Sequence, residues 1–559
     1  MNSTLKVDVG EKLVVSFPYK PGIVEKIRTI PGRRFDKQRK VWIIPFSGLK
    51  TLIEMFGLSE KNFSQKAKKY WEYYKNTVLA RQISPHRFKF PFRTRPYKHQ
   101  LEAFYRACHF YSFALFLEMG LGKTKVAIDT VAYRYICKQI DKALVICPKS
   151  IIETWKEEII KHCPLVVTPY RILLIKGTAS KKLELLKKWL LTRELAFAIM
   201  NYESLIIPSV KDFLVKAMDE KIMLIFDEST KIKSPSAKRT KVAMKLAEKT
   251  LFRLILTGSP ITNSWEDIYT QWYIIDLGEN FGHSFYEFRN RYFYPDSNGW
   301  RWYLKEGKEK EIKEVIQSQS IIIKKEDAID LPSKVYEKMY VDLTEEQQKA
   351  YTELKRHFIT EVEGKEITAA FILPRLLKLS EICNGFIIDE EGNVTEFPSN
   401  PKLEILKELL EDILPHKKVV IWSRFRYTIY QICQRFKEYN PVALYGDTSK
   451  NAQEIVKRFQ EDPTCRIFVG NPRAGGLGIT LTATDTAIYI NNSFSLEERI
   501  QSEDRIHRIG SERYNKCLYI DIVAKETIEE DILKALASKK EIVEYIREKG
   551  WKNILKGEV

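Results

Sequence analysis

The sequence predicts an α/β protein with two lobes, each built on a parallel β-sheet, and a small α+β domain at the N-terminus. Short, continuously apolar runs alternate with helical stretches between about residues 96 and 265, and the alternation returns after about residue 400. Such runs are typical of parallel strands that are covered by helices on both faces. The stretch between them is charged and helical in character, so we expect helical insertions where the lobes join.

The apolar runs and the changes in composition also suggest where the domains begin and end. In the first lobe we expect strands at 113–117, 143–147, 196–200, 222–226 and 253–256. In the second lobe we expect them at 419–422, 442–445, 467–469, 487–490 and 518–522. The expected parts are a small domain (1–60), a basic and aromatic linker (61–95), the first lobe (96–275), helical insertions with the inter-lobe linker (276–400), the second lobe (401–545) and a tail (546–559).

Length and charge narrow the class of protein. A chain of 559 residues allows three or four domains at roughly 100–200 residues each. The net charge of +19 favours a polyanionic partner such as nucleic acid, although an ordinary soluble basic protein fits the charge equally well.

The eight cysteines form no Cys-x-x-Cys pair, which argues against a zinc finger. We see no signal peptide and no apolar run of about 20 residues, so we expect no membrane association.

A candidate phosphate-binding loop lies at residues 118–124, which read Glu-Met-Gly-Leu-Gly-Lys-Thr between an expected strand and an expected helix. Glycines let backbone N–H groups close around phosphates at the N-terminus of the helix. We expect Lys123 to contact the outer phosphates of ATP and Thr124 to bind Mg²⁺. The strict pattern fails at one position, because Leu117 stands where its first glycine would be. The loop itself would be formed by Gly120, Leu121 and Gly122.

Two further patterns of the first lobe complete the candidate nucleotide site. Asp227 and Glu228 follow the strand 222–226, and carboxylates at the end of a strand beside a phosphate loop can serve phosphoryl transfer. We expect Asp227 to hold the metal and Glu228 to activate the attacking water; an ordinary acidic exit from a strand is the alternative. Upstream, the amide of Gln100 could pair with the edge of adenine, since it donates and accepts at once.

The second lobe supplies a candidate pair of arginine fingers. Arg505 and Arg508 are three residues apart, so on a helix they would share one face. Guanidinium groups that face a γ-phosphate from another lobe can raise the rate by roughly 10³–10⁵. A solvated basic helix is the alternative.

The glycine-rich segment 475–482 of the second lobe lies between two expected strands. It places Gly478 among the candidate nucleotide-binding residues.

Together these motifs resemble those of the Swi/Snf family within helicase superfamily two. Residues 119–124, 256–260 (Leu-Thr-Gly-Ser-Pro) and 504–510 (Asp-Arg-Ile-His-Arg-Ile-Gly) are close to the patterns of that family. The resemblance covers about 90–545 and implies two RecA-like lobes, ATP hydrolysis with Mg²⁺ and tracking along duplex DNA. It also implies a set of contacts to the DNA backbone, made by Pro148, Lys149, Ser150, Asn201, Ser423 and Thr482.

The chain departs from the family pattern in places. The acidic pair continues as Ser229-Thr230, where the family has His in the fourth position, so the coupling role of that position is in doubt. Ser511 stands where the family usually has Gln. None of these departures removes a catalytic group.

The first sixty residues resemble the HARP domain of annealing helicases, over segments 17–20, 31–36 and 39–42. The segment 33–42 combines cations, which suit phosphates, with Trp42, which suits exposed bases at a fork. The candidate DNA contacts are Arg33, Arg34 and Arg39. The alternative is a packed domain with a buried Trp42 and solvated arginines.

The sequence therefore predicts a DNA-dependent ATPase that translocates on double-stranded DNA and anneals strands or remodels branched DNA in repair or replication. Three alternatives stay open: a strand-separating helicase, an RNA-dependent ATPase and an inactive scaffold that binds nucleic acid. The retained lysine, acidic pair and arginine pair argue against the scaffold. We expect a monomer in the cytoplasm of a microbe or of a virus's host, or in the nucleus of a eukaryote. The sequence indicates no particular protein partner.

Overall fold

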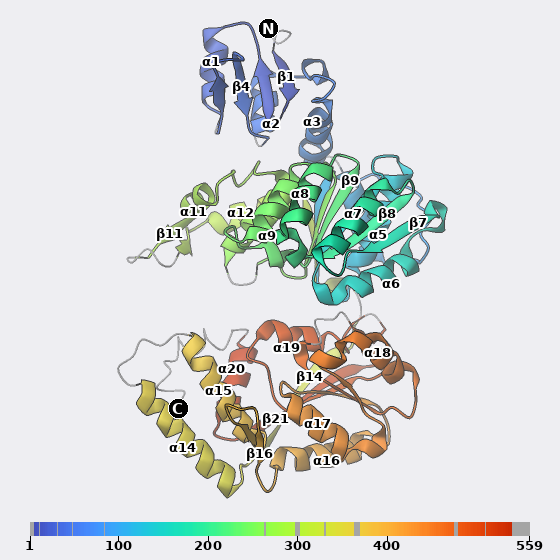
Figure 1. Cartoon of the computed structure of the whole chain (residues 1–559), viewed down its shortest axis with the longest axis vertical. Helices are drawn as coiled ribbons and strands as arrows, with labels where there is room; N and C mark the ends of the chain where they lie inside the picture. The colour runs from blue at the N-terminus through green and yellow to red at the C-terminus, as the bar shows by residue number, and fades with distance from the viewer. Residues whose placement is uncertain are drawn as a thin grey trace. The chain divides into compact units, whose positions relative to one another are not determined.

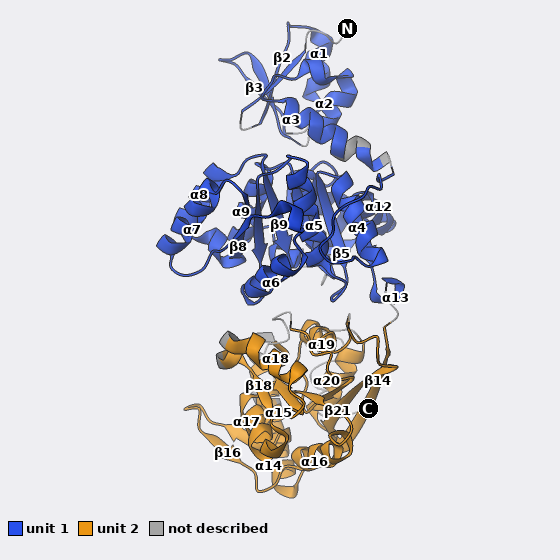
Figure 2. Ribbon diagram, turned by 90° about the vertical axis from the view of Figure 1, so that its right-hand side faces the viewer, with its two compact units in different colours: residues 1–328 blue, residues 329–559 orange. Residues whose placement is uncertain are grey.

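The computed structural model describes residues 5–10, 12–30, 32–46, 48–82, 84–261, 264–296, 302–328, 331–362, 369–473, 479–508 and 510–538. The chain divides into two compact units, residues 1–328 and 329–559 (Figure 2). The first unit holds the small N-terminal domain and the first lobe, and the second unit holds the second lobe. Among the described residues, no helix has the length and apolar character that crossing a membrane requires.

The N-terminal domain is a four-stranded antiparallel sheet in the order β1-β2-β4-β3, with two helices packed on it (Figure 1). Its strands are β1 (Lys6–Val9), β2 (Leu13–Ser16), β3 (Arg34–Asp36) and β4 (Val41–Ile44), and its helices are α1 (Pro21–Arg28) and α2 (Gly48–Phe56). Val7, Leu13 and Val15 face the helices and are fully buried. The small α+β domain expected at this end of the chain is therefore present.

The segment that follows this domain is packed rather than extended. Helix α3 (Lys68–Tyr73) and the π-helical turn Tyr74–Val78 add buried tyrosines to the core of the domain. The hydroxyl of Tyr73 donates to the carbonyl of Ile275 in the first lobe (3.2 Å), and Arg81 pairs with Glu279 (2.7 Å). The first half of the segment 61–95 is thus a packed joint with the first lobe, where the composition had suggested a linker.

The sheet of the first lobe has seven parallel strands in the order β13-β5-β10-β9-β6-β8-β7. Their bounds are β5 (Ser112–Leu117), β6 (Lys142–Cys147), β7 (Tyr170–Leu174), β8 (Leu195–Asn201), β9 (Ile222–Asp227), β10 (Arg253–Leu256) and β13 (Ser320–Ile323). The five expected strands are all present. The two edge strands β7 and β13 were missed; each is partly exposed, and each has within its bounds an apolar run of only three residues.

Helices surround this sheet (Figure 1). They are α4 (Lys98–His109), α5 (Lys123–Ile136), α6 (Ile152–His162), α7 (Ala179–Leu191), α8 (Pro208–Ala217), α9 (Lys238–Ala247) and α10 (Ile268–Asp276). An insertion follows, made of α11 (Phe285–Tyr292), the hairpin β11 (Phe293–Pro295) and β12 (Trp302–Leu304), and α12 (Lys308–Ser318). The chain then returns to the sheet as β13 and ends the unit with α13 (Lys325–Ala328).

The second lobe has six parallel strands in the order β14-β21-β20-β17-β19-β18. Their bounds are β14 (Ser333–Val341), β17 (Val419–Trp422), β18 (Val442–Leu444), β19 (Ile467–Gly470), β20 (Thr486–Tyr489) and β21 (Lys516–Ala524). Strand β14 belongs to this sheet although it precedes the next strand of the sheet, β17, by many residues. The segment 276–400, where we expected helical insertions and the inter-lobe linker, therefore also contributes a strand to the sheet of the second lobe.

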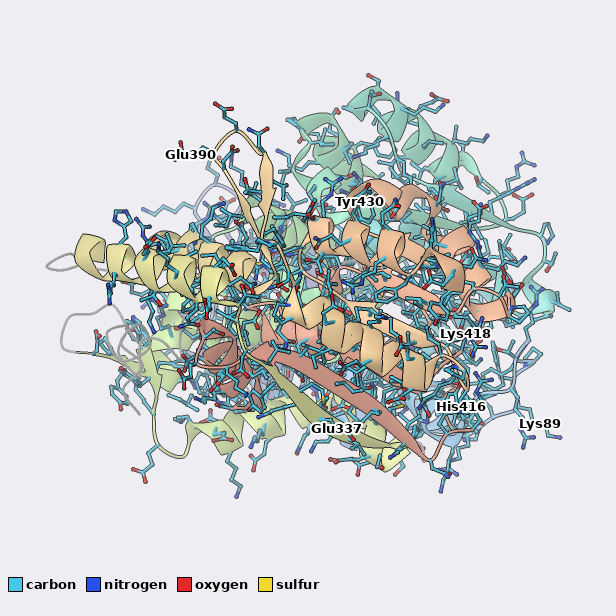
Figure 3. All side chains as sticks on the ribbon, turned by 90° about the horizontal axis from the view of Figure 1, so that it is seen from below. Lys89, Glu337, Glu390, His416, Lys418 and Tyr430 are labelled. Carbon is cyan, nitrogen blue, oxygen red and sulfur yellow. The ribbon has the colours of Figure 1, made fainter. Side chains whose placement is uncertain are left out.

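The remaining elements of the second lobe are mostly helical. They are α14 (Glu345–Val362), α15 (Ala369–Cys383), α16 (Pro401–Ile413), α17 (Arg426–Arg435), α18 (Ala452–Glu461), α19 (Leu496–Glu503) and α20 (Ile528–Ala537). The hairpin of β15 (Phe386–Ile388) and β16 (Val394–Glu396) stands out from them, with Glu390 at its tip (Figure 3). The two parallel sheets and the antiparallel N-terminal domain agree with the predicted fold class.

Candidate nucleotide site and DNA interface

The candidate phosphate loop lies where strand β5 ends and helix α5 begins. Gly120 and Gly122 have φ of 85° and 84°, in the left-handed region that residues with a Cβ rarely adopt. Gly122 is the N-cap residue of α5, and a Cβ there would lie 2.3 Å from Nε2 of Gln100. Both glycines thus suit the backbone of the loop, and the loop leads into a helix N-terminus, which favours a bound anion.

Two polar side chains brace this loop from either side. Lys123 is 9% exposed, and its Nζ donates to the carbonyl of Leu117 (2.8 Å). The Nε2 of Gln100 donates to the carbonyl of Leu121 (3.1 Å), and its Oε1 accepts from the backbone N–H of Tyr97 (3.1 Å). A carboxamide has two N–H bonds and two lone pairs, so this geometry leaves capacity for one more donor and one more acceptor contact. That is the pair of contacts that an adenine edge would use.

Asp227 ends strand β9 and is held by neighbours that fix both of its oxygens. Its Oδ2 accepts from the indole Nε1 of Trp155 (2.8 Å), and its Oδ1 accepts from the backbone N–H of Glu228 (2.9 Å). Burial raises the pKa of Asp227, and the nearby charge of Lys123 opposes that shift. Trp155 escaped the sequence analysis because a tryptophan among the apolar positions of α6 gives no sign of a polar role.

Glu228 has a left-handed backbone, with φ 52° and ψ 58°. This conformation costs a residue other than glycine about 1–3 kcal/mol and is found most often at functional sites. The hydroxyl of Tyr202 donates to the carbonyl of Asp227 (2.7 Å) and so braces the same turn.

The residue after the acidic pair connects it to the Leu-Thr-Gly-Ser-Pro segment. The hydroxyl of Ser229 is buried and donates to Oε1 of Gln271 (2.7 Å). The Nε2 of Gln271 donates to the carbonyls of Pro260 (2.6 Å) and Asp267 (2.9 Å). Ser229, the third residue of the acidic motif, is therefore linked through Gln271 to the segment 256–260. The family pattern had drawn attention to the fourth residue, Thr230. Gln271 lies within helix α10, and no motif had drawn attention to it.

The oxygen donors of the first lobe fit magnesium better than a softer metal. The hydroxyl of Thr124 and the carboxylate of Asp227 are hard ligands of the kind Mg²⁺ prefers. The described part of the chain has no group of three or more His, Cys, Asp or Glu that could hold a metal by themselves. A magnesium ion here would therefore depend on the phosphates of its nucleotide, as is usual for this ion.

Arg505 and Arg508 converge in the second lobe, although they do not lie on a helix as the spacing had suggested. Helix α19 ends at Glu503, whose carbonyl accepts from the hydroxyl of Tyr519 (3.0 Å). The carbonyl of Arg505 accepts from the N–H of Leu481 (2.9 Å), so neighbouring segments take up carbonyls that a longer helix would use. The two guanidinium groups still meet, because both donate to the carbonyl of Ile479 (3.2 and 3.1 Å). Gly478, the residue before it, lies outside the described residues.

The candidate DNA contacts of the first lobe lie at one edge of its parallel sheet. Pro148, Lys149 and Ser150 follow strand β6, and Asn201 ends the neighbouring strand β8. Lys149 and Ser150 are exposed, as a contact to a phosphate requires. Asn201 is largely buried, and its side chain accepts from the hydroxyl of Ser204.

Lys182 is a further cation at this edge that the sequence analysis did not single out. Its Nζ donates to the hydroxyl of Ser204 (2.7 Å), which brings it next to Asn201. Burial lowers the pKa of Lys182; the carboxylate of Glu203 opposes this shift, and the charge of Lys149 adds to it. A phosphate placed beside Lys182 would favour its charged form.

The candidate contacts of the second lobe face inward. Ser423 is fully buried at the end of β17, and its hydroxyl accepts from Nδ2 of Asn491 (3.1 Å). Thr482 is 8% exposed, and its carbonyl accepts from Arg513 (2.6 Å). Because both side chains are buried, a DNA contact at these positions would have to come from the backbone or from neighbouring residues.

The basic cluster of the N-terminal domain is exposed. Arg33, Arg34 and Arg39 lie on or beside the edge strand β3 and are all exposed. Trp42 is half-buried and packs against Phe35 across the strand pair, with ring centroids 5.1 Å apart. Phe35 is 44% exposed. The domain therefore presents an aromatic edge beside its arginines, and Trp42 contributes to this edge and to the core.

Comparison with known proteins places these features in a family. The SNF2-related domain matches residues 97–386, which is more than half of the chain. This chain belongs to the SNF2-related family. The helicase conserved C-terminal domain matches residues 401–510, so both lobes of an SNF2-type ATPase of helicase superfamily two are present in order.

Several relatives of this SNF2 protein have been described. An uncharacterized ATP-dependent helicase of Mycoplasma genitalium is 29% identical over 440 residues, which cover 76% of this chain and 39% of that protein. A homologue of SWI/SNF-related matrix-associated actin-dependent regulator of chromatin subfamily A-like protein 1 from Caenorhabditis elegans is 24% identical over 96% of this chain and 75% of its own length. The chain thus spans about two fifths of the Mycoplasma relative. The SWI2/SNF2 ATPase core of Sulfolobus solfataricus, solved with double-stranded DNA, aligns with 83% of this chain and 96% of its own at 24% identity, with a TM-score of 0.40.

Proposed function

We propose that this SNF2 protein is an ATP-driven motor that tracks along duplex DNA, and that it anneals strands or remodels forks. The observation that carries the proposal is the joint geometry of the phosphate loop and the acidic pair. The loop opens helix α5 with Lys123, and the neighbouring charge of Lys123 acts on Asp227 at the end of β9. A buried lysine near a buried carboxylate, at the carboxyl ends of parallel strands, suits a nucleotide with its metal ion.

Each residue of the site has a separate task in this proposal. Asp227 and Thr124 would hold Mg²⁺, which would supply positive charge beside the phosphates. Trp155 keeps the carboxylate of Asp227 aimed at that position. Glu228 orients the attacking water and receives its proton. Arg505 and Arg508 stabilise the charge that develops on the phosphates, which makes hydrolysis depend on both lobes.

The duplex itself would be held by its phosphates. The net charge of +19 supplies the general attraction, and Lys149 and Lys182 form a local cationic site. Contacts of this kind carry little sequence information, so the motor would act on any sequence.

The nucleic-acid requirement of ATP hydrolysis tests this proposal. We expect turnover to be stimulated strongly by duplex and forked DNA, and weakly by single strands or RNA. The assay compares all four at equal nucleotide concentration and moderate salt, because salt weakens every phosphate contact. Equal or stronger stimulation by RNA would contradict the proposal that DNA is the substrate. The absence of any stimulation would contradict the proposal that the protein is a nucleic-acid motor.

The exposed edge of the N-terminal domain supports the choice of forked DNA. Replacing Arg33, Arg34 and Arg39 together with Ala removes three exposed cations and touches none of the buried core. We expect the triple variant to keep its duplex-stimulated turnover and to lose most of the additional stimulation by forks. A variant with Lys20, Lys26 and Arg28 replaced on the same domain is the matched control. A fork response equal to that of the parent protein would leave this cluster without a role in DNA recognition.

One observation favours strand separation as a second candidate function. The β11–β12 hairpin extends from the first lobe (Figure 1), with Tyr294 and Tyr303 paired across it on its exposed face, 51% and 45% exposed. The opposite face is anchored, because Phe293 is buried and Arg289 lies over the ring of Trp302. Exposed aromatic rings on a firm hairpin can stack on unpaired bases.

A further inference from the structure

The first residues of the second unit contact the segment that carries the arginine pair. The carbonyl of Pro332 lies 2.9 Å from Nε2 of His507, which stands between the two arginines in the sequence. The next contacts come from Lys334 and Tyr336, at the start of strand β14, and both reach Glu503. The chain that enters the second lobe is therefore bound directly to the residues on either side of Arg505.

Glu503 is the centre of these contacts. Its Oε2 accepts from Nζ of Lys334 (2.8 Å) and from the hydroxyl of Tyr336 (2.8 Å), and its Oε1 accepts from Nε of Arg499 (2.8 Å). Burial would raise the pKa of Glu503, but the charges of Lys334 and Arg499 outweigh burial and hold it below its usual value. The carboxylate is thus ionised and gains strong, charge-assisted hydrogen bonds on both of its oxygens.

The other side of this cluster is fixed to the sheet. The guanidinium of Arg499 forms a bidentate pair with Asp521 on strand β21 and lies 3.6 Å from the ring centroid of Tyr489. Strand β21 pairs in parallel with β14 along nine residues. Glu337, which Figure 3 labels, is an exposed residue of β14. Lys334 and Tyr336 lie on β14, so they can move only if that strand moves. Arg499, the third group that holds Glu503, is anchored in the core.

We propose that Lys334 and Tyr336 are positioning residues for the arginine pair: through Glu503 they fix the turn that holds Arg505 and Arg508, so that strand β14, at the start of the second unit, sets the positions of both guanidinium groups. The inference rests on the proposed hydrolytic function. It adds that the first strand of the second unit acts on catalysis through its side chains. Neither residue touches the nucleotide in this account.

The expected signature is a change in turnover that leaves binding intact. Lys334→Met and Tyr336→Phe should each lower kcat for ATP, with Lys334→Met at about 10-fold to 10²-fold, because small displacements of catalytic groups cost on that order. KM for ATP and Kd for duplex DNA should stay within about 2-fold, since the loop, the acidic pair and the cationic edge are in the other unit. Lys334→Arg keeps the charge and should recover most of the turnover. Lys338→Met, an exposed lysine on the same strand, is the matched control and should behave as the parent protein.

Two further measurements separate positioning from simple loss of stability. In an Arg505→Ala, Arg508→Ala background, Lys334→Met should have no additional effect on kcat, because residues that act through one another are not additive. Amide hydrogen exchange of residues 504–508 should be faster in Lys334→Met than in Lys338→Met, while exchange of β17 and β21 stays unchanged.

The outcomes are distinct. An unchanged kcat in Lys334→Met, or an equal loss in the background that lacks both arginines, would overturn the proposal even if the parent protein is an active ATPase. Unchanged exchange of 504–508 would overturn it whether or not the protein hydrolyses ATP. A different result is also possible, in which the parent protein shows no DNA-stimulated turnover but exchange is faster in the variant. That result would contradict the proposed function and would support the role of Lys334 in holding residues 504–508.

Discussion

Glu228→Gln should bind ATP as the parent protein does and hydrolyse it slower by about 10²–10⁴-fold, the usual contribution of a general base. The substitution preserves the size of the side chain and removes only its ability to take a proton. The backbone of the turn is held by Tyr202 and by the hydrogen bond from Glu228 N–H to Asp227, and neither contact uses the replaced carboxylate. Nucleotide affinity should therefore survive, which single-turnover hydrolysis and a binding titration measure separately.

The control for this variant is Glu184→Gln on helix α7, which removes an exposed carboxylate that pairs with Lys181. It should leave turnover unchanged. Normal DNA-stimulated turnover in Glu228→Gln would show that another group activates the water, and the assignment of the acidic pair would fail.

Arg508→Ala should lower turnover by about 10³-fold or more, within the range that arginine fingers contribute. The side chain donates to the carbonyl of Ile479, so a melting curve of the variant must accompany the kinetics. Binding of ATP and of duplex DNA should stay near the parent values, because the finger acts on charge that develops in the transition state. Steady-state kinetics with parallel binding measurements check this.

Arg505→Ala should behave similarly with a smaller loss of turnover. Arg435→Ala, an exposed arginine of α17 that pairs with Glu404, is the control for the loss of a surface charge on the same lobe. If both Arg508→Ala and Arg505→Ala keep most of their turnover, the second lobe does not supply the fingers.

Strands with continuous apolar runs were predictable, and so were the segments at their ends. Strands β5 and β9 are buried along their whole length, which makes them visible in the sequence and places the loop and the acidic pair at one sheet edge. Strands β7 and β13 lie at the edges of their sheet, where both are partly exposed and have only three consecutive apolar residues each. The parallel pairing of β14 with β21 joins residues far apart in the chain, which no local pattern records.

The parts of the site that escaped prediction depend on long-range contacts. Trp155 reaches Asp227 from a helix 72 residues earlier, and Gln271 reaches Ser229 from 42 residues later. The arginine pair was placed on a helix from its spacing alone. Tyr519 and Leu481, which donate to carbonyls of this segment, come from other parts of the chain.

The packed joint after the N-terminal domain changes how its role should be tested. The core of that domain includes Tyr70, Tyr73 and Tyr74, all beyond residue 60. Cutting the chain at residue 60 would therefore expose these rings and disturb the contact of Tyr73 with Arg253 in the first lobe. Substitution of exposed arginines leaves this joint intact, which makes it a cleaner experiment than deletion.

Displacement of a third strand from a DNA triplex is the most direct test of the motor. The substrate is a long duplex with a triplex-forming oligonucleotide bound at one end, so that a protein moving along the duplex removes the oligonucleotide without separating the duplex. The account predicts ATP-dependent displacement by the parent protein, a delay that grows with the length of the duplex track, and no displacement by Glu228→Gln. Hydrolysis of ATP without displacement, or separation of the duplex strands in place of displacement, would contradict it.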